Sequence, residues 1–145
     1  MSKTMLALCQ ANLGSAIPAK ERYLGEVDQT DYSPLSIGGS YVVYGLLCVF
    51  ERVDFLVRVP EQPPFWAPSS LFQLVDARIP AGWQLCITQT RPDYKCLFEA
   101  FKISHVIGYP LLVNEYEHYI GVVERDPVEV LRFLEEVERI AEPWG

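Results

Sequence analysis

The stretch YVVYGLLCVFERVDFLVRV, from Tyr41 to Val59, decides the fold of this chain of 145 residues. Its first part, Tyr41 to Phe50, is apolar at nearly every position, as in a central strand that is covered on both faces. Its last part, Phe55 to Val59, alternates, and Arg58 belongs to the face opposite the main apolar one. A polar break from Glu51 to Asp54 separates the two parts. The pattern predicts two antiparallel strands joined by a short turn.

Shorter patterns predict further elements on either side of this hairpin. Apolar runs favour strands at Arg22–Val27 and Trp83–Gln89, and a strand or a single helical turn at Leu71–Asp76. Paired glycines at Gly38-Gly39 allow a tight bend before the central strand. Four prolines between Pro60 and Pro68 predict an extended segment without regular hydrogen bonds.

Two segments later in the chain carry weaker helical patterns. Tyr94–Ile107 fits one face of a helix and also fits a strand, and the helix is the interpretation we favour. Asn114 is expected to cap a short helix that Gly121 ends.

The clearest helix begins at Asp126 and runs to Ala141. Asp126 is an N-cap, Pro127 takes the first helical position, and Glu129 completes a capping box. Charged residues on this helix are expected to form i,i+4 pairs, Arg132 with Glu136 and Glu135 with Arg139. The apolar residues recur at a spacing of three and four: Val130, Phe133, Leu134, Val137, Ile140 and Ala141.

Composition and length agree with one globular unit. The chain is 50% hydrophobic and 21% charged, which excludes a disordered protein, and no apolar run approaches the ~18 residues of a membrane span. Met5 to Cys9 is too short an apolar stretch for a secretion signal. We therefore predict a single cytoplasmic α+β domain, 1–145, in which a C-terminal helix packs on a curled antiparallel sheet.

The residues show no arrangement that predicts catalysis, a metal or a cofactor. The four cysteines form no Cys-x-x-Cys pair, and His105 and His118 have no cysteine at the spacing of a metal site. We expect the thiols to be reduced. Cys96 and His105 lie nine residues apart, too far in the sequence to imply contact, and Gly38-Gly39 lacks the rest of a phosphate loop. The interpretation we favour is a protein that is not an enzyme.

Three aromatic residues allow two interpretations. Phe65, Trp66 and Trp83 either form an exposed recognition patch or fold back over the core of the sheet. Burial over the core is the interpretation we favour. The other possibility is an aromatic pocket, which would make the chain a small-ligand or regulatory binding domain.

Three motifs together resemble a known class of small bacterial β-rich domains. They are LSIGGSYVVYG at 35–45, PSSLFQLVDARIPAGW at 68–83, and Gly108-Tyr109-Pro110 followed by an acidic helical tail. Domains similar to this are often immunity proteins of bacterial polymorphic toxin systems. The resemblance implies that the chain binds and neutralises a cognate toxin, with a nuclease as one candidate. It identifies no functional residue, because these motifs serve folding.

The charge distribution gives the candidate partner surface. The net charge of −7 argues against a nucleic-acid ligand. It suits a basic protein partner, although mere solubility explains it as well and is the simpler interpretation. Nine acidic residues and three arginines lie between Glu115 and Glu142, so this segment holds most of the excess negative charge. Tyrosines beside carboxylates are typical of an anchor among steering charges. The predicted partner-binding residues are Glu115, Tyr116, Glu117, Tyr119, Glu124 and Asp126.

Overall fold

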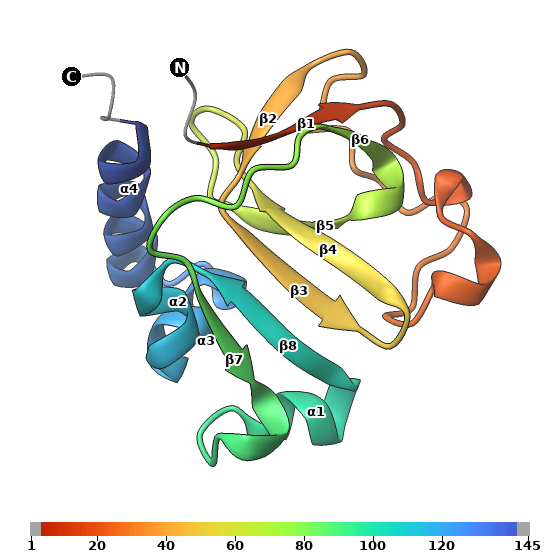
Figure 1. Cartoon of the computed structure of the whole chain (residues 1–145). Helices are drawn as coiled ribbons and strands as arrows, with labels where there is room; N and C mark the ends of the chain where they lie inside the picture. The colour runs from red at the N-terminus through yellow and green to blue at the C-terminus, as the bar shows by residue number, and fades with distance from the viewer. Residues whose placement is uncertain (1–3, 142–145) are drawn as a thin grey trace.

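Two antiparallel sheets and a group of helices make up residues 4–141, the part of the chain that the computed structural model describes (Figure 1). The three-stranded sheet has the order β2 (Ser40–Val43), β1 (Met5–Cys9), β6 (Phe72–Asp76). The five-stranded sheet has the order β5 (Phe65–Pro68), β4 (Arg52–Val57), β3 (Gly45–Val49), β8 (Ile103–Gly108), β7 (Gln84–Ile87). The predicted α+β class is confirmed, with antiparallel pairing throughout these two sheets.

The apolar run that begins at Tyr41 is two strands rather than one. The chain bends at Tyr44, so β2 pairs with β1 in one sheet while β3 lies at the centre of the other. Gly45 lies opposite Gly108, and a Cβ at Gly45 would come within 2.8 Å of the Leu112 side chain. The absence of a side chain at both positions therefore lets Leu112 pack on the strands where the sheet curls.

The predicted hairpin is confirmed, although its second strand begins earlier than the sequence indicated. Phe50 and Glu51 form the turn, because Val49 already pairs with Arg52. Arg52 and the residues that follow it therefore belong to β4 rather than to a polar loop. β4 shows no alternation of buried and exposed residues, since five of its six residues are buried.

Two expectations for the flanking segments are wrong. Residues 22–27 form turns after a short 3-10 helix (Ala19–Glu21) instead of a strand, and another such helix covers Gly14–Ala16. The proline-rich segment does form a strand at its end, where β5 pairs with β4. β5 lies at the edge of the sheet. An edge strand tolerates Pro68, which has no N–H group to donate to a neighbouring strand.

The ambiguous segments resolve into short elements of both kinds. Residues 71–76 hold β6 after a 3-10 helix at Ser69–Leu71, and β7 confirms the strand predicted around residues 83–89. A 3-10 helix at Thr88–Thr90 follows β7. The segment 94–107 is half helix and half strand: α1 (Lys95–Phe101) ends at Lys102, whose φ of 60° turns the chain into β8.

The last three helices are α2 (Pro110–Asn114), α3 (Tyr116–Glu124) and α4 (Pro127–Ala141). Asn114 is the final residue of α2, and Glu115 precedes α3, so the predicted Asn114 cap is wrong. Gly121 lies inside α3 and does not end it. A Cβ at Gly121 would come within 2.3 Å of Glu129, so the glycine permits close packing of α3 against α4.

The predicted C-terminal helix is confirmed in position and in packing. The Asp126 carboxylate accepts the Glu129 N–H at 3.2 Å, and Phe133 is fully buried against Tyr44 at a ring distance of 5.2 Å. The expected i,i+4 pairs do not form: Arg132 bonds Glu129 and Arg139 bonds Glu136, both three residues apart. Among residues 4–141, no helix is long and apolar enough to span a membrane.

Hydrophobic side chains gather in two cores. One lies between the five-stranded sheet and the helices and includes Leu47, Tyr94 and Phe133. The other lies between the two sheets and includes Ala7 and Phe55. Figure 1 shows α2, α3 and α4 together on one side of the molecule, away from the 3-10 helices of residues 14–21.

Candidate functional site

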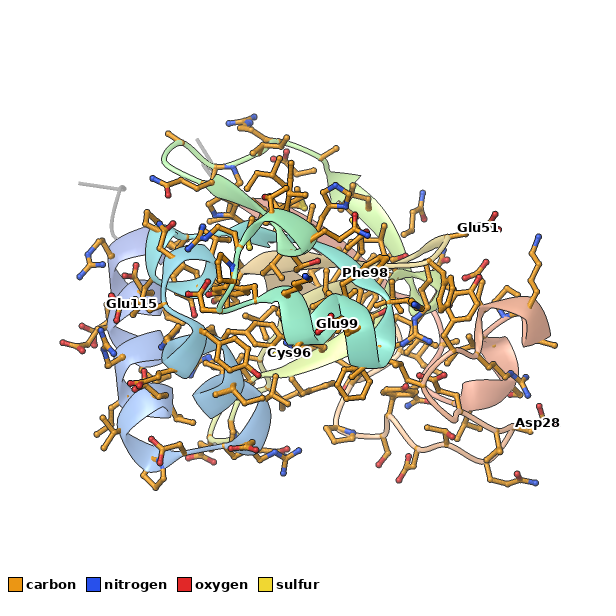
Figure 2. All side chains as sticks on the ribbon, turned by 90° about the horizontal axis from the view of Figure 1, so that it is seen from below. Asp28, Glu51, Cys96, Phe98, Glu99 and Glu115 are labelled. Carbon is orange, nitrogen blue, oxygen red and sulfur yellow. The ribbon has the colours of Figure 1, made fainter. Side chains whose placement is uncertain are left out.

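Four of the predicted partner-binding residues are exposed acidic side chains. Glu117 and Glu124 belong to α3, and Asp126 lies in the turn between α3 and α4. Glu115 is exposed as well, and its carboxylate lies 3.6 Å from Arg132 of α4. The structure therefore brings these carboxylates to the surface at the helical end of the molecule, where Figure 2 labels Glu115.

The two predicted tyrosines lie on the inner side of α3. Tyr119 is only 3% exposed and packs on Trp66 and Tyr94, so its predicted role as a surface anchor is wrong. Tyr116 is half-buried, lies edge-on to Tyr94, and its hydroxyl accepts a hydrogen bond from the Cys96 thiol at 3.4 Å. Both rings complete the helical core because the inward face of α3 carries them.

Other apolar side chains, and not the two tyrosines, are exposed on α3 and α4. Val123 is 46% exposed at the end of α3, and Val128 and Leu131 are 61% and 62% exposed on the first turns of α4. Val128 and Leu131 are three residues apart and share the helix face opposite the buried Phe133. We call the exposed residues Glu117, Val123, Glu124, Asp126, Val128 and Leu131 the acidic corner. The sequence showed the acidic residues of this corner but not its apolar members. These were missed because the apolar stripe through Phe133 already explained how α4 packs.

A second feature is an open hollow of about 770 Å³ beside the acidic corner, which we call the aromatic groove. Its floor is the helix-side face of β3 and β4, and its walls are the segment 23–32, the start of β5, and helices α1 and α3. Figure 2 shows α1 between the segment that carries Asp28 and the helices α3 and α4. Six aromatic residues line the groove: Tyr23, Tyr32, Phe65, Trp66, Phe101 and Tyr119.

A buried ion cluster lies at the floor of the aromatic groove. The Arg52 guanidinium donates to both oxygens of Asp54, at 2.6 and 2.9 Å, and its third nitrogen lies 3.0 Å from the Glu26 carboxylate. The side chains of Arg52, Asp54 and Glu26 are 2%, 3% and 7% exposed. Arg52 and Asp54 are two residues apart in β4, so both point to the face that Leu47 and Val49 occupy.

Neighbouring groups show the electrostatic effect of this cluster. Burial raises the pKa of Asp54, Arg52 opposes that rise, and Glu26 adds to it. Burial and then Glu26 raise the pKa of Tyr32 to about 12. The cluster holds two carboxylates and one guanidinium, so a negative charge is in excess at the floor of the groove.

The aromatic residues with two interpretations are half-buried over the cores. Trp66 packs against the helical core and Phe65 against the core between the sheets, and both line the aromatic groove. Trp83 also packs on the core between the sheets, and it lines a separate hollow of about 740 Å³ against α2 and α4. The indole N–H groups of Trp66 and Trp83 are buried and have no acceptor among the described residues.

A hydrogen-bonded chain through His118 connects three elements inside the helical core. The Tyr109 hydroxyl lies 2.7 Å from Nε2 of His118, and Nδ1 lies 2.8 Å from the Glu129 carboxylate. Because a carboxylate only accepts, Nδ1 carries the proton and Nε2 accepts from Tyr109. Burial lowers the pKa of His118, against the effect of Glu129. His118 is fully buried, so this chain joins α3 to α4 and to Tyr109, which follows β8, inside the core.

The structure also places Cys48 of β3 opposite His105 of β8, a pair that the sequence did not indicate. Burial raises the pKa of the Cys48 thiol, whereas a nucleophilic cysteine needs a lowered one. Cys9, Cys48, Cys86 and Cys96 are all free. Within residues 4–141, no group of three His, Cys, Asp or Glu side chains is placed to hold a metal ion.

Comparisons of the chain with family models, with curated proteins and with solved structures found no match.

Proposed function

We propose that the chain is an immunity protein that binds a basic bacterial toxin acting in the cytoplasm and neutralises it by covering its cleft. The observation that carries this proposal is the acidic corner, where α3, α4 and the turn between them expose both carboxylates and apolar side chains. Protein-binding sites typically have this arrangement, with apolar residues at the centre and polar residues around them.

The charge distribution supports a basic partner. Between Glu115 and Glu142, nine acidic residues and three arginines give a local net charge of −6, out of −7 for the whole chain. A surface of one sign attracts a partner of the opposite sign and speeds association. Nuclease toxins fit this charge well, because a cleft that binds a polyanion has to be basic. The resemblance of 35–45, 68–83 and 108–110 to immunity domains supports the same proposal.

The test is to co-express the chain with any basic, toxin-like protein that a neighbouring reading frame encodes, and to measure cell survival and binding. The variant Glu117→Lys/Glu124→Lys is expected to slow association and to flatten its salt dependence, with little change in melting temperature. A matched control, Glu51→Lys/Glu61→Lys, reverses two exposed carboxylates outside α3 and α4 and is expected to bind normally. Unchanged survival and association rate in the first variant would refute a role for the acidic corner.

A small-ligand or regulatory binding domain is the second candidate function. The aromatic groove favours it, because about 770 Å³ lies within the range of roughly 300–1,000 Å³ that is usual for ligand pockets. Native mass spectrometry of the gently purified protein distinguishes the two candidates. A bound metabolite that dissociates on denaturation favours the ligand domain, and a co-purified basic protein favours the immunity protein.

A further inference from the structure

The excess negative charge at the floor of the aromatic groove has no compensating cation among its lining residues. Arg52 is shared by Asp54 and Glu26, and the remaining charged residues of the lining, Glu124 and Arg125, offset each other at the rim. The three clustered side chains are at most 7% exposed, so water screens the excess charge poorly. Such a charge favours a bound cation.

The walls of the groove are also suited to a cation. Faces of tyrosine, tryptophan and phenylalanine rings attract ammonium and guanidinium groups. At the mouth, Leu24, Phe101 and Val123 are 42%, 52% and 46% exposed, so an entering side chain passes an apolar rim before it reaches the carboxylates. An arginine has both the long apolar stem and the planar charged end that this arrangement requires.

Tyr23, one of the lining residues, contacts a residue with an uncommon backbone conformation. Phe50, at the tip of the β3–β4 hairpin, has a φ of 51° and is 58% exposed. Its ring contacts that of Tyr23 at a centroid distance of 4.6 Å. A bulky residue with positive φ on a surface turn is uncommon, and such strain concentrates at functional sites. Phe50 therefore fixes Tyr23, a wall of the groove, in its position.

We infer that the aromatic groove receives an arginine side chain of the protein partner, whose guanidinium approaches Glu26 and Asp54 between the aromatic walls. The inference rests on the proposed function, because the arginine belongs to the basic toxin. The groove and the acidic corner form one continuous docking surface, since Val123 and Glu124 belong to both. The acidic corner steers the partner, and the groove binds its arginine.

The probe for the test is the capped tripeptide acetyl-Gly-Arg-Gly-amide, titrated into the whole protein while the indole N–H signal of Trp66 is followed by NMR. A saturable shift with a dissociation constant on the order of 1 mM is expected for so small a ligand. The peptide with citrulline in place of arginine has nearly the same shape without the charge, and it is expected to give no saturable shift. Equal shifts with both peptides, or none with the arginine peptide, would overturn the inference.

Variants locate the binding in the groove. Glu26→Gln keeps the size of the side chain and one of its two acceptor oxygens, so it can accept from Arg52 or from the Leu24 N–H but not from both. It removes the excess charge and should weaken arginine binding about tenfold or more. Phe101→Ser removes an exposed ring at the mouth without opening a core, and it should weaken binding several-fold. The control Glu61→Gln removes an exposed carboxylate outside the groove and should bind as the wild type does. Wild-type affinity in Glu26→Gln would refute the site.

The same variants separate this inference from the proposed function. If Glu26→Gln still neutralises the toxin at the wild-type association and dissociation rates, the inference fails and the proposed function stands. If the arginine peptide binds the groove but no basic partner is neutralised, the proposed function fails and the cation site stands.

Discussion

Replacing Tyr109 by phenylalanine removes one hydroxyl from the hydrogen-bonded chain through His118. The ring is retained, so the contact with Phe133 at 6.4 Å is kept and no large cavity forms. The loss is the hydrogen bond of 2.7 Å to Nε2 of His118, which then remains as a buried acceptor without a donor. An unsatisfied buried acceptor costs about 1–3 kcal/mol, so a fall in melting temperature of about 2–12 °C is expected.

The pH dependence of stability gives the second part of this prediction. Burial lowers the pKa of His118 in the folded protein, so below its ordinary value of 6.5 the unfolded chain binds more protons. The stability that depends on neutral His118 is therefore fully present above about pH 6.5. It is lost as the pH falls through the lowered pKa of His118 in the folded protein. Without the Tyr109 hydroxyl the neutral imidazole loses its donor, so its pKa rises and the loss on acidification becomes less steep.

Urea denaturation of the wild type and of Tyr109→Phe between about pH 5 and pH 7.5 measures both effects. Tyr116→Phe is the matched control, because the Tyr116 hydroxyl accepts only a weak hydrogen bond from an exposed thiol. This control should change stability by less than about 0.5 kcal/mol. Equal stability of Tyr109→Phe and the wild type, with identical pH profiles, would refute the assignment of the Tyr109–His118 hydrogen bond.

Three further predictions concern the core, the ion cluster and the thiols. Phe133→Ala should cost about 3–5 kcal/mol in urea denaturation, because it leaves a cavity where α4 packs on Tyr44; a cost below about 1 kcal/mol would contradict the packing. Arg52→Met should cost about 3–5 kcal/mol of folding stability, because it leaves two buried carboxylates without their cation. This cost should shrink at low pH, where carboxylates are protonated. A loss of stability that does not depend on pH would argue against the cluster. Cys96 is the exposed thiol of the four free cysteines and should react first with a thiol reagent in the folded protein, with all four reacting after denaturation without reductant; two unreactive thiols would reveal a disulfide.

The sequence by itself determined those features that depend on neighbouring residues. Asp126, Pro127 and the stripe through Phe133 specify α4, because a cap and a spacing of three and four residues fix a helix and its buried face. The run before Phe50 predicted a central strand, and β3 is the middle strand of its sheet. The concentration of negative charge after Glu115 was also readable, since charge depends on composition alone.

The tertiary structure decided everything that depends on which distant segment covers a residue. Arg52 and Asp54 have the polarity of a loop, yet they are buried in β4 because Glu26, remote in the sequence, supplies the second carboxylate of their cluster. Gly121 has the character of a helix stop, yet it lies inside α3, where the missing side chain lets α4 pack closely. Tyr119 was placed on the surface by its acidic neighbours, whereas Trp66 from β5 covers it. In each case the deciding contact comes from an element that pairs or packs only after the chain has folded, so no local pattern contains it.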